Sequence, residues 1–168
     1  MRNVDLASVL LRVALGITML AHGYNHAFGG GKLPGTARWF ESIGIRPGRI
    51  HAAVATLTEL GAGLFLVIGL LTPLAAGAVM GTMLVALITN HLKNGFFIFR
   101  PGEGYEYVLM IILASAGLAG LGGGRPSVDN AIDFDLAGWA GLGAALVIGV
   151  GGSAVLLATS WRPAKAGS

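Results

Sequence analysis

Four residues that can carry a proton or bind a ligand lie in or at the end of four different apolar segments: His22, Glu59, His91 and Glu106. A titratable side chain inside hydrocarbon is energetically costly, so it is rare there without a partner or a function. If successive segments run in opposite directions through a bilayer, all four residues fall toward one membrane face, which we call face B. The opposite face is face A. This convergence predicts a polar site near face B.

Glu59 and His22 are the candidate catalytic residues of this site. With a helical rise of about 1.5 Å per residue, Glu59 lies roughly 12 Å inside its segment and His22 roughly 7 Å from the end of its own. A neighbouring imidazole would hold the carboxyl ionised, and these groups could relay protons or hydrogen-bond a quinone carbonyl. The alternative is structural: a neutral Glu59 hydrogen-bonded between helices, and His22 as an interfacial histidine.

His91 and Glu106 complete the candidate cofactor-binding set as the rim of the site. Glu106 also has a structural explanation, because the macrodipole favours an acidic residue in the first turn of a helix. His91 is close to water, which makes an interfacial role its alternative. His26 and His51 lie at the same end, and we assign both to the membrane interface.

Arg12 is predicted to be buried near face A, away from the site. An arginine in an apolar helix either extends its head group to the interface or pairs with an acid. Asp129 and Asp133, in the link before the last apolar segment, are the candidate partners. We therefore assign Arg12 a structural role.

The spacing of these residues does not indicate a metal centre. One His or Glu from each of four helices is a pattern that bundles use for metals and cofactors, but the Glu-x-x-His pairs of di-iron bundles are missing. The chain has no cysteine, which excludes thiolate ligands, iron–sulfur clusters and dithiol exchange within the chain. We expect no metal ion. A quinone is the cofactor that these side chains could bind, and whether the site is catalytic stays open.

The composition indicates a membrane protein. Of the 168 residues, 54% are hydrophobic and only 11% are charged, whereas a soluble domain has about 25% charged residues. Such a chain has too little charge to cover a globule in water. The net charge of +3 does not indicate nucleic-acid binding, because the basic residues form no stripe. The expected partner is the lipid bilayer.

Five segments approach the length of about 20 residues that a membrane helix needs: 5–27, 51–71, 73–92, 105–121 and 136–158. The predicted fold is an all-α membrane protein, a four-helix transmembrane bundle followed by a fifth C-terminal hydrophobic helix. Thr72-Pro73 predicts a tight turn between the second and third helices, and residues 36–43 a short amphipathic helix on the membrane surface. We divide the chain into a bundle, 1–128, and a second part, 129–168, with an acidic link, the fifth helix and a basic tail.

The basic residues gather in the connections at face B. Because positive residues accumulate on the cytoplasmic side, we expect face B to be cytoplasmic, with the N-terminus outside and the C-terminus inside. Face A has Arg2 and Arg125, whereas face B has Lys32, Arg38, Arg46, Arg49, Lys93, Arg100, Arg162 and Lys165.

Small residues recur at intervals of four in the fifth segment, at Gly141, Ala145, Gly149 and Ser153. This spacing lets helix backbones approach closely. The stripe can pack within the chain or form a homo-oligomer with a second copy.

Several short motifs follow one another between residues 6 and 129: Leu10 to Gly16 around Arg12, His22-Gly23-Tyr24, Trp39 to Gly44, Thr58 to Gly63, Gly69 to Ala76, the segment around His91, and Gly104 to Tyr107. In this order they resemble the DoxX family of small bacterial membrane proteins. The family includes subunits of thiosulfate:quinone oxidoreductase and membrane partners of oxidative-stress enzymes.

The resemblance implies a four-helix bundle in the bacterial inner membrane with a quinone-linked or redox-associated role. The motifs place Arg12, His22, Glu59, His91 and Glu106 on matching positions. Family members commonly have a lysine shortly after the His-Gly pair, where this chain has Asn25 and His26, so an anion-binding role is not carried over. The fifth segment lies outside the family pattern.

Three functions remain open from the sequence. The first is a redox-associated membrane subunit whose polar site binds a quinone head group or relays protons, with a soluble or membrane redox enzyme as partner. The second is a non-enzymatic scaffold that anchors such an enzyme through Arg38, Arg46 and Arg49. The third is a protein for proton or small-solute permeation, which Glu59 favours but no internal repeat supports.

Overall fold

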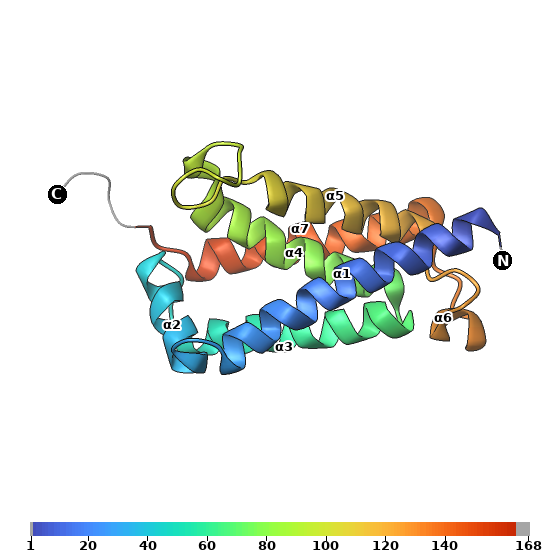
Figure 1. The fold of residues 1–168 in the computed structure, drawn as a ribbon, viewed down its shortest axis with the longest axis horizontal. Coiled ribbons are helices and arrows are strands. Elements are labelled where there is room, and N and C mark those ends of the chain that lie inside the picture. The colour runs from blue at the N-terminus through green and yellow to red at the C-terminus, as the bar shows by residue number, and fades with distance from the viewer. Residues whose placement is uncertain (1, 164–168) are drawn as a thin grey trace.

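Helices account for the fold of residues 2–163, the part of the chain that the computed structural model describes (Figure 1). Lys165, which we assigned to face B, lies outside the described residues. In chain order the helices are α1 (Asn3–Phe28), α2 (Lys32–Ser42), α3 (Gly48–Ile68), α4 (Thr72–Ala86), the π-helix η1 (Leu87–His91), the 3-10 helix η2 (Leu92–Asn94), α5 (Glu106–Leu121), α6 (Val128–Ala131) and α7 (Gly138–Ser160).

Four of these helical segments are long and apolar enough to cross a membrane: α1, α3, the continuous run Thr72–Asn94, and α7. α5 is apolar but has only 16 residues, which corresponds to about 24 Å against a hydrocarbon core of about 30 Å. The prediction of an all-α membrane protein is confirmed.

α1, α3, α4 and α5 form a ring in which each helix packs against two neighbours, and α7 packs outside the ring on α4 and α5. Figure 1 shows α1 and α3 together on one side of the molecule and α4, α5 and α7 on the other, with α2 across one end. Met19, Leu66, Met80 and Leu118 fill the space between the helices. The end with α2 corresponds to face B, and the end where α1 begins corresponds to face A.

The small residues of α7 face α4 and α5. Gly141, Ala145, Gly149 and Ser153 are all buried. A Cβ atom at Gly77 would lie 2.9 Å from Ala145 Cα, and one at Gly149 would lie 2.9 Å from the carbonyl oxygen of Gly77. The stripe therefore packs within the chain, and it is not free to contact a second copy.

The turn between α3 and α4 is completed by an acid from the distant link. Gly69 and Leu71 have positive φ angles of 70° and 48°, and Pro73 fits the first turn of α4 because that position needs no N–H donor. The carboxylate of Asp129 accepts hydrogen bonds from the N–H groups of Leu71 at 2.6 Å and Thr72 at 2.9 Å. This explains why α4 begins where the Thr-Pro pair occurs.

Arg12 is buried at this end, with only 2% of its surface exposed. Its Nη2 donates a hydrogen bond to the carbonyl oxygen of Pro126 at 2.6 Å. Within the described residues Arg12 forms no ion pair with Asp129 or Asp133. Its guanidinium group occupies the space that a side chain at residue 69 would need, so Gly69 is required there.

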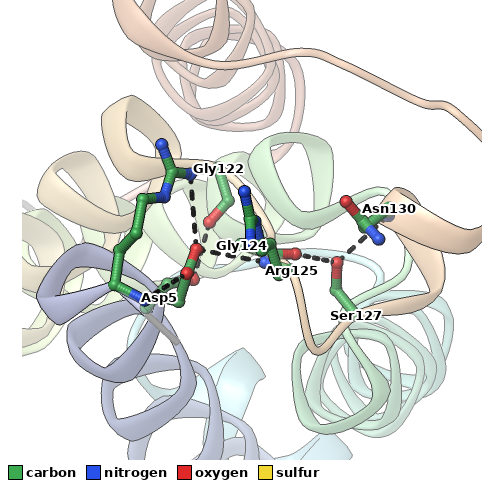
Figure 2. Close-up of polar contacts among 8 residues, drawn as sticks. Asp5, Gly122, Gly124, Arg125, Ser127 and Asn130 are labelled. Atoms are coloured by element: carbon green, nitrogen blue, oxygen red, sulfur yellow. Dashed lines mark hydrogen bonds and ion pairs between the residues drawn. The ribbon is translucent and has the colours of Figure 1, made fainter.

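A second hydrogen-bond network joins the start of α1 to the link before α6 (Figure 2). The carboxylate of Asp5 accepts from the backbone N–H groups of Arg2 at 2.8 Å and Arg125 at 3.3 Å. Ser8 Oγ donates to the carbonyl oxygen of Gly122 at 2.7 Å. The face A end is thus fixed by side chains that bind backbone groups across more than one hundred positions of sequence.

Candidate functional site

A cavity of about 490 Å³ lies at the face B end, between the α1/α3 side of the molecule and α4, η1, α5 and α7. Most of its wall is apolar. The titratable residues that line it are His22, His26, His51, Glu59, His91, Glu103 and Tyr107. A large, mainly apolar cavity with a few converging polar groups is the usual form of a small-molecule site.

Glu59 is the most deeply buried acid of this cavity, with 3% of its surface exposed. It lies on α3, and its Oε2 is 2.9 Å from Nδ1 of His26 on α1. Both atoms are buried and neither forms a hydrogen bond with a described residue, so the contact is a close approach of two titratable groups rather than a hydrogen bond. The contact is an ion pair when the imidazole carries a proton, and a buried pair of this kind is a candidate proton carrier.

The sequence favoured His22 as the partner of Glu59, and the structure gives it His26 instead. His22 and His26 are four residues apart, so both project from one face of α1 toward the cavity. The ring of His22 stacks on Tyr107 of α5, with 6.3 Å between centroids and 21° between planes. Both histidines therefore line the cavity, but only His26 contacts the carboxylate.

His91 is the last residue of η1, where the π-helix gives way to the 3-10 helix η2. Its Nδ1 is 2.9 Å from the carbonyl oxygen of Glu103, and its Nε2 is 3.4 Å from Nδ2 of Asn90. The π-helix turns Thr89, Asn90 and His91 toward the cavity wall. Single π-helical turns occur frequently at functional sites.

Glu106 is not among the described residues that line the cavity. It begins α5, and its Oε2 accepts a hydrogen bond from the backbone N–H of Ile98 at 3.2 Å. The position matches the structural explanation, an acid in the first turn that also holds the preceding loop. Glu103 and Tyr107, its neighbours in sequence, reach the cavity instead.

α2 covers the cavity at face B. This helix corresponds to the predicted amphipathic segment 36–43, although it begins at Lys32 and ends at Ser42, and it packs on α3 with Ala37 and Phe40 buried. The end of α7 is tied to the link after α2, because Trp161 Nε1 donates to the carbonyl oxygen of Ile43 at 3.0 Å. Phe40 and Ile43 both line the cavity, so apolar side chains separate it from the face B surface.

The sequence assigned His26 and His51 to the membrane interface, and both line the cavity. His51 Nδ1 is buried without a partner among the described residues. For His26, the spacing of four residues from His22 was a signal that both rings share a helix face. For His51 no such signal existed, because its side chain reaches inward only where α2 folds over the start of α3.

The sequence model of the DoxX family matches residues 7–92. No curated protein and no solved structure matches the chain. The matched region contains most of α1 and all of α2, α3, α4 and η1. It therefore includes His22, His26, His51, Glu59 and His91. Glu106 and α7 lie beyond it. Since the match covers more than half of the 168 residues, the chain belongs to the DoxX family.

Proposed function

We propose that this DoxX-family protein is a redox-associated membrane subunit that binds a quinone head group in the face B cavity. The observation that carries the proposal is the buried contact of 2.9 Å between His26 and Glu59 in the wall of a mainly apolar cavity. A quinone ring is flat and apolar, with two carbonyl oxygens that accept hydrogen bonds. The cavity offers apolar walls, the ring of Tyr107 and imidazole donors for such a molecule.

In this proposal His26 and Glu59 carry protons, and His22 and His91 orient the head group from the rim. Reduction of a quinone to a quinol takes up two electrons and two protons. The electrons come from the reduced donor of a partner redox enzyme, which is oxidised in the same step. The protons reach the quinone oxygens through the imidazole and carboxyl groups, which can each give up and regain a proton.

We further propose that face B is the cytoplasmic face of a bacterial inner membrane. Arg38, Arg46 and Arg49 are exposed around α2 and the start of α3, and the positive-inside rule places such residues in the cytoplasm. The same exposed arginines offer a surface on which an acidic partner enzyme can bind. Protons would then enter the cavity from the cytoplasmic side.

Glu59→Gln tests the proposal. The amide keeps the shape of the side chain but cannot form an ion pair or carry a proton. We expect quinone affinity to fall about tenfold or more, because the protonated imidazole that donates to the quinone loses the carboxylate that stabilises its charge, and a hydrogen bond that involves a charged group is worth about 1.5–3 kcal/mol. Electron transfer from a co-purified partner to quinone should fall further. Titration of the purified protein with quinone, with a parallel assay of quinone reduction, measures both.

Glu106→Gln is the matched control, because Glu106 is acidic, near face B and outside the cavity lining. It should leave quinone affinity within about twofold of the unchanged protein. If the unchanged protein binds no quinone, the proposal is wrong. If Glu59→Gln is silent while neutralising Arg38, Arg46 and Arg49 releases a partner enzyme, the chain is a scaffold.

A further inference from the structure

The cavity continues from the histidines to the lipid-facing side of the molecule. α7 packs on α4 and α5, but among the described residues α3 and α7 are not a packed pair. Val54 and Thr58 of α3 and Ile148, Gly152 and Leu156 of α7 all line the same cavity. A groove therefore runs between α3 and α7, with α4 as its floor.

The floor of this groove is formed by small residues of α4. Ala78, Gly81 and Thr82 of α4 line it. The hydroxyl of Thr82 donates to the carbonyl oxygen of Ala78 at 3.1 Å, so its hydrogen bond is satisfied within the helix. A Cβ atom at Gly81 would lie 3.1 Å from the carbonyl oxygen of Gly149, which shows how closely α7 approaches α4 beside the groove.

The groove is elongated and has polar groups on one side only, which suits a chain-like molecule with one polar end. Along α7 it runs from Leu156, near face B, to Ile148, a distance of roughly 12 Å along the helix. The titratable groups His26, His51 and Glu59 come from α1 and α3, whereas Ile148, Gly152 and Leu156, which line the groove from α7, are apolar. An amphiphile with a polar head and a single long apolar tail matches this distribution.

The face B end of the groove is closed. The backbone N–H of Arg162 donates to the carbonyl oxygen of Gly44 at 2.7 Å, and that of Arg46 donates to the carbonyl oxygen of Ser160 at 2.9 Å. These bonds join the end of α7 to the link between α2 and α3. The side between α3 and α7 remains open, and half of the surface of Val54 is exposed there.

We propose that the groove between α3 and α7 binds the apolar tail of the ligand and admits it sideways from the bilayer. The inference rests on the proposed function, since the head group of the same molecule occupies the site at His26 and Glu59. It adds a second, apolar subsite, which binds a long hydrocarbon or isoprenoid chain. It also assigns a role to α7, which lies outside residues 7–92 that match the family.

Gly152→Trp tests this subsite. Gly152 lines the groove, and a Cβ atom there would meet no atom within 4 Å, so a side chain can begin at this position without pushing α7 away from its neighbours. An indole added there is large enough to obstruct the groove. Gly151→Trp is the matched control. Gly151 is the preceding residue of α7, is exposed and equally free of neighbours, but does not line the cavity.

Each variant is titrated with two quinones that share one ring, one with a long isoprenoid tail and one with a methyl group in its place. We expect Gly152→Trp to weaken binding of the tailed quinone about tenfold or more. The tail-less quinone should bind both variants and the unchanged protein within about threefold of one another. Gly151→Trp should bind the tailed quinone as the unchanged protein does.

The outcomes separate the two proposals. If the unchanged protein binds both quinones and Gly152→Trp binds the tailed one normally, the tail subsite is wrong and the head-group site stands. If Gly152→Trp weakens both quinones equally, the tryptophan reaches the head-group site and the tail subsite is again wrong. If the unchanged protein binds neither quinone, the proposed function is wrong and the tail subsite with it.

Discussion

Two buried carboxyl groups, one at each end of the bundle, are held by different kinds of partner. Asp129 accepts hydrogen bonds from two backbone N–H groups, whereas Glu59 has the ring of His26 beside it. A peptide N–H does not give up its proton near neutral pH, so the partners of Asp129 give it a structural role. An imidazole exchanges its proton readily in that range. The partners of Asp129 thus favour a structural role at face A, and the partner of Glu59 favours proton transfer at face B.

Asp129→Asn should destabilise the protein. The side-chain amide has one accepting oxygen in place of two, so the N–H of either Leu71 or Thr72 at the start of α4 loses its partner. An unsatisfied buried donor costs about 1–3 kcal/mol. Asp133→Asn is the control, because Asp133 is exposed and asparagine tolerates its positive φ of 55°. Thermal unfolding in detergent measures both, and equal midpoints would contradict the assigned role of Asp129.

The sequence was enough to predict how far each residue lies from the membrane face. It was not enough to predict the direction in which each side chain points from its helix. Counting residues along an apolar segment gives distance from the membrane face, which places Glu59 well inside its helix. The rotation of each helix, which decides whether His22 or His26 meets Glu59, depends on packing between helices. Arg12 is similar: its burial was expected, but its partner is the carbonyl oxygen of Pro126 because Asp129 is occupied by α4.

At the scale of elements, α7 is joined to the bundle by close backbone contact rather than by large side chains. Glycine and alanine stand where α4 and α7 cross, at Gly77, Gly81, Ala145 and Gly149. In lipid, helices gain no hydrophobic energy from association, so close packing has to supply it. The same contact positions Ile148 and Gly152 beside the cavity.

Gly149→Ala should loosen this contact. The new methyl group would lie 2.9 Å from the carbonyl oxygen of Gly77, so α7 must move away from α4. Overpacking of this kind costs about 1–3 kcal/mol. Gly143→Ala adds the same methyl group to the same helix where no atom lies within 4 Å, and should be neutral. Unfolding midpoints of the two variants provide the test; an unchanged midpoint for Gly149→Ala would mean that the contact tolerates expansion.

Hydropathy was sufficient for the main helices, because burial in lipid requires long apolar segments whatever their tertiary contacts. The π-helix Leu87–His91 and the fold of α2 over the cavity needed the structure. Neither changes the hydropathy pattern, since η1 continues the apolar run of α4 and α2 is short and mixed in composition. The stripe on α7 was ambiguous for a related reason: small residues indicate close packing but not the partner.

For the whole molecule, the two ends differ in what they can do. The face A end is fixed by hydrogen bonds between side chains and backbone groups, in which Ser8 and Arg12 donate and Asp5 and Asp129 accept. The face B end contains the cavity and its histidines. Which end faces the cytoplasm decides where protons and a partner enzyme approach the proposed site.

Single cysteines can settle this orientation, because the chain has none of its own. Arg49→Cys lies at face B and Asn130→Cys at face A, and both positions are exposed. With face B in the cytoplasm, a maleimide that cannot cross membranes should label Asn130→Cys in intact cells and Arg49→Cys only after permeabilisation. The cysteine-free protein controls for background. The reverse labelling would place face B outside, so that the cavity would exchange protons with the exterior and a cytoplasmic electron donor could not reach it.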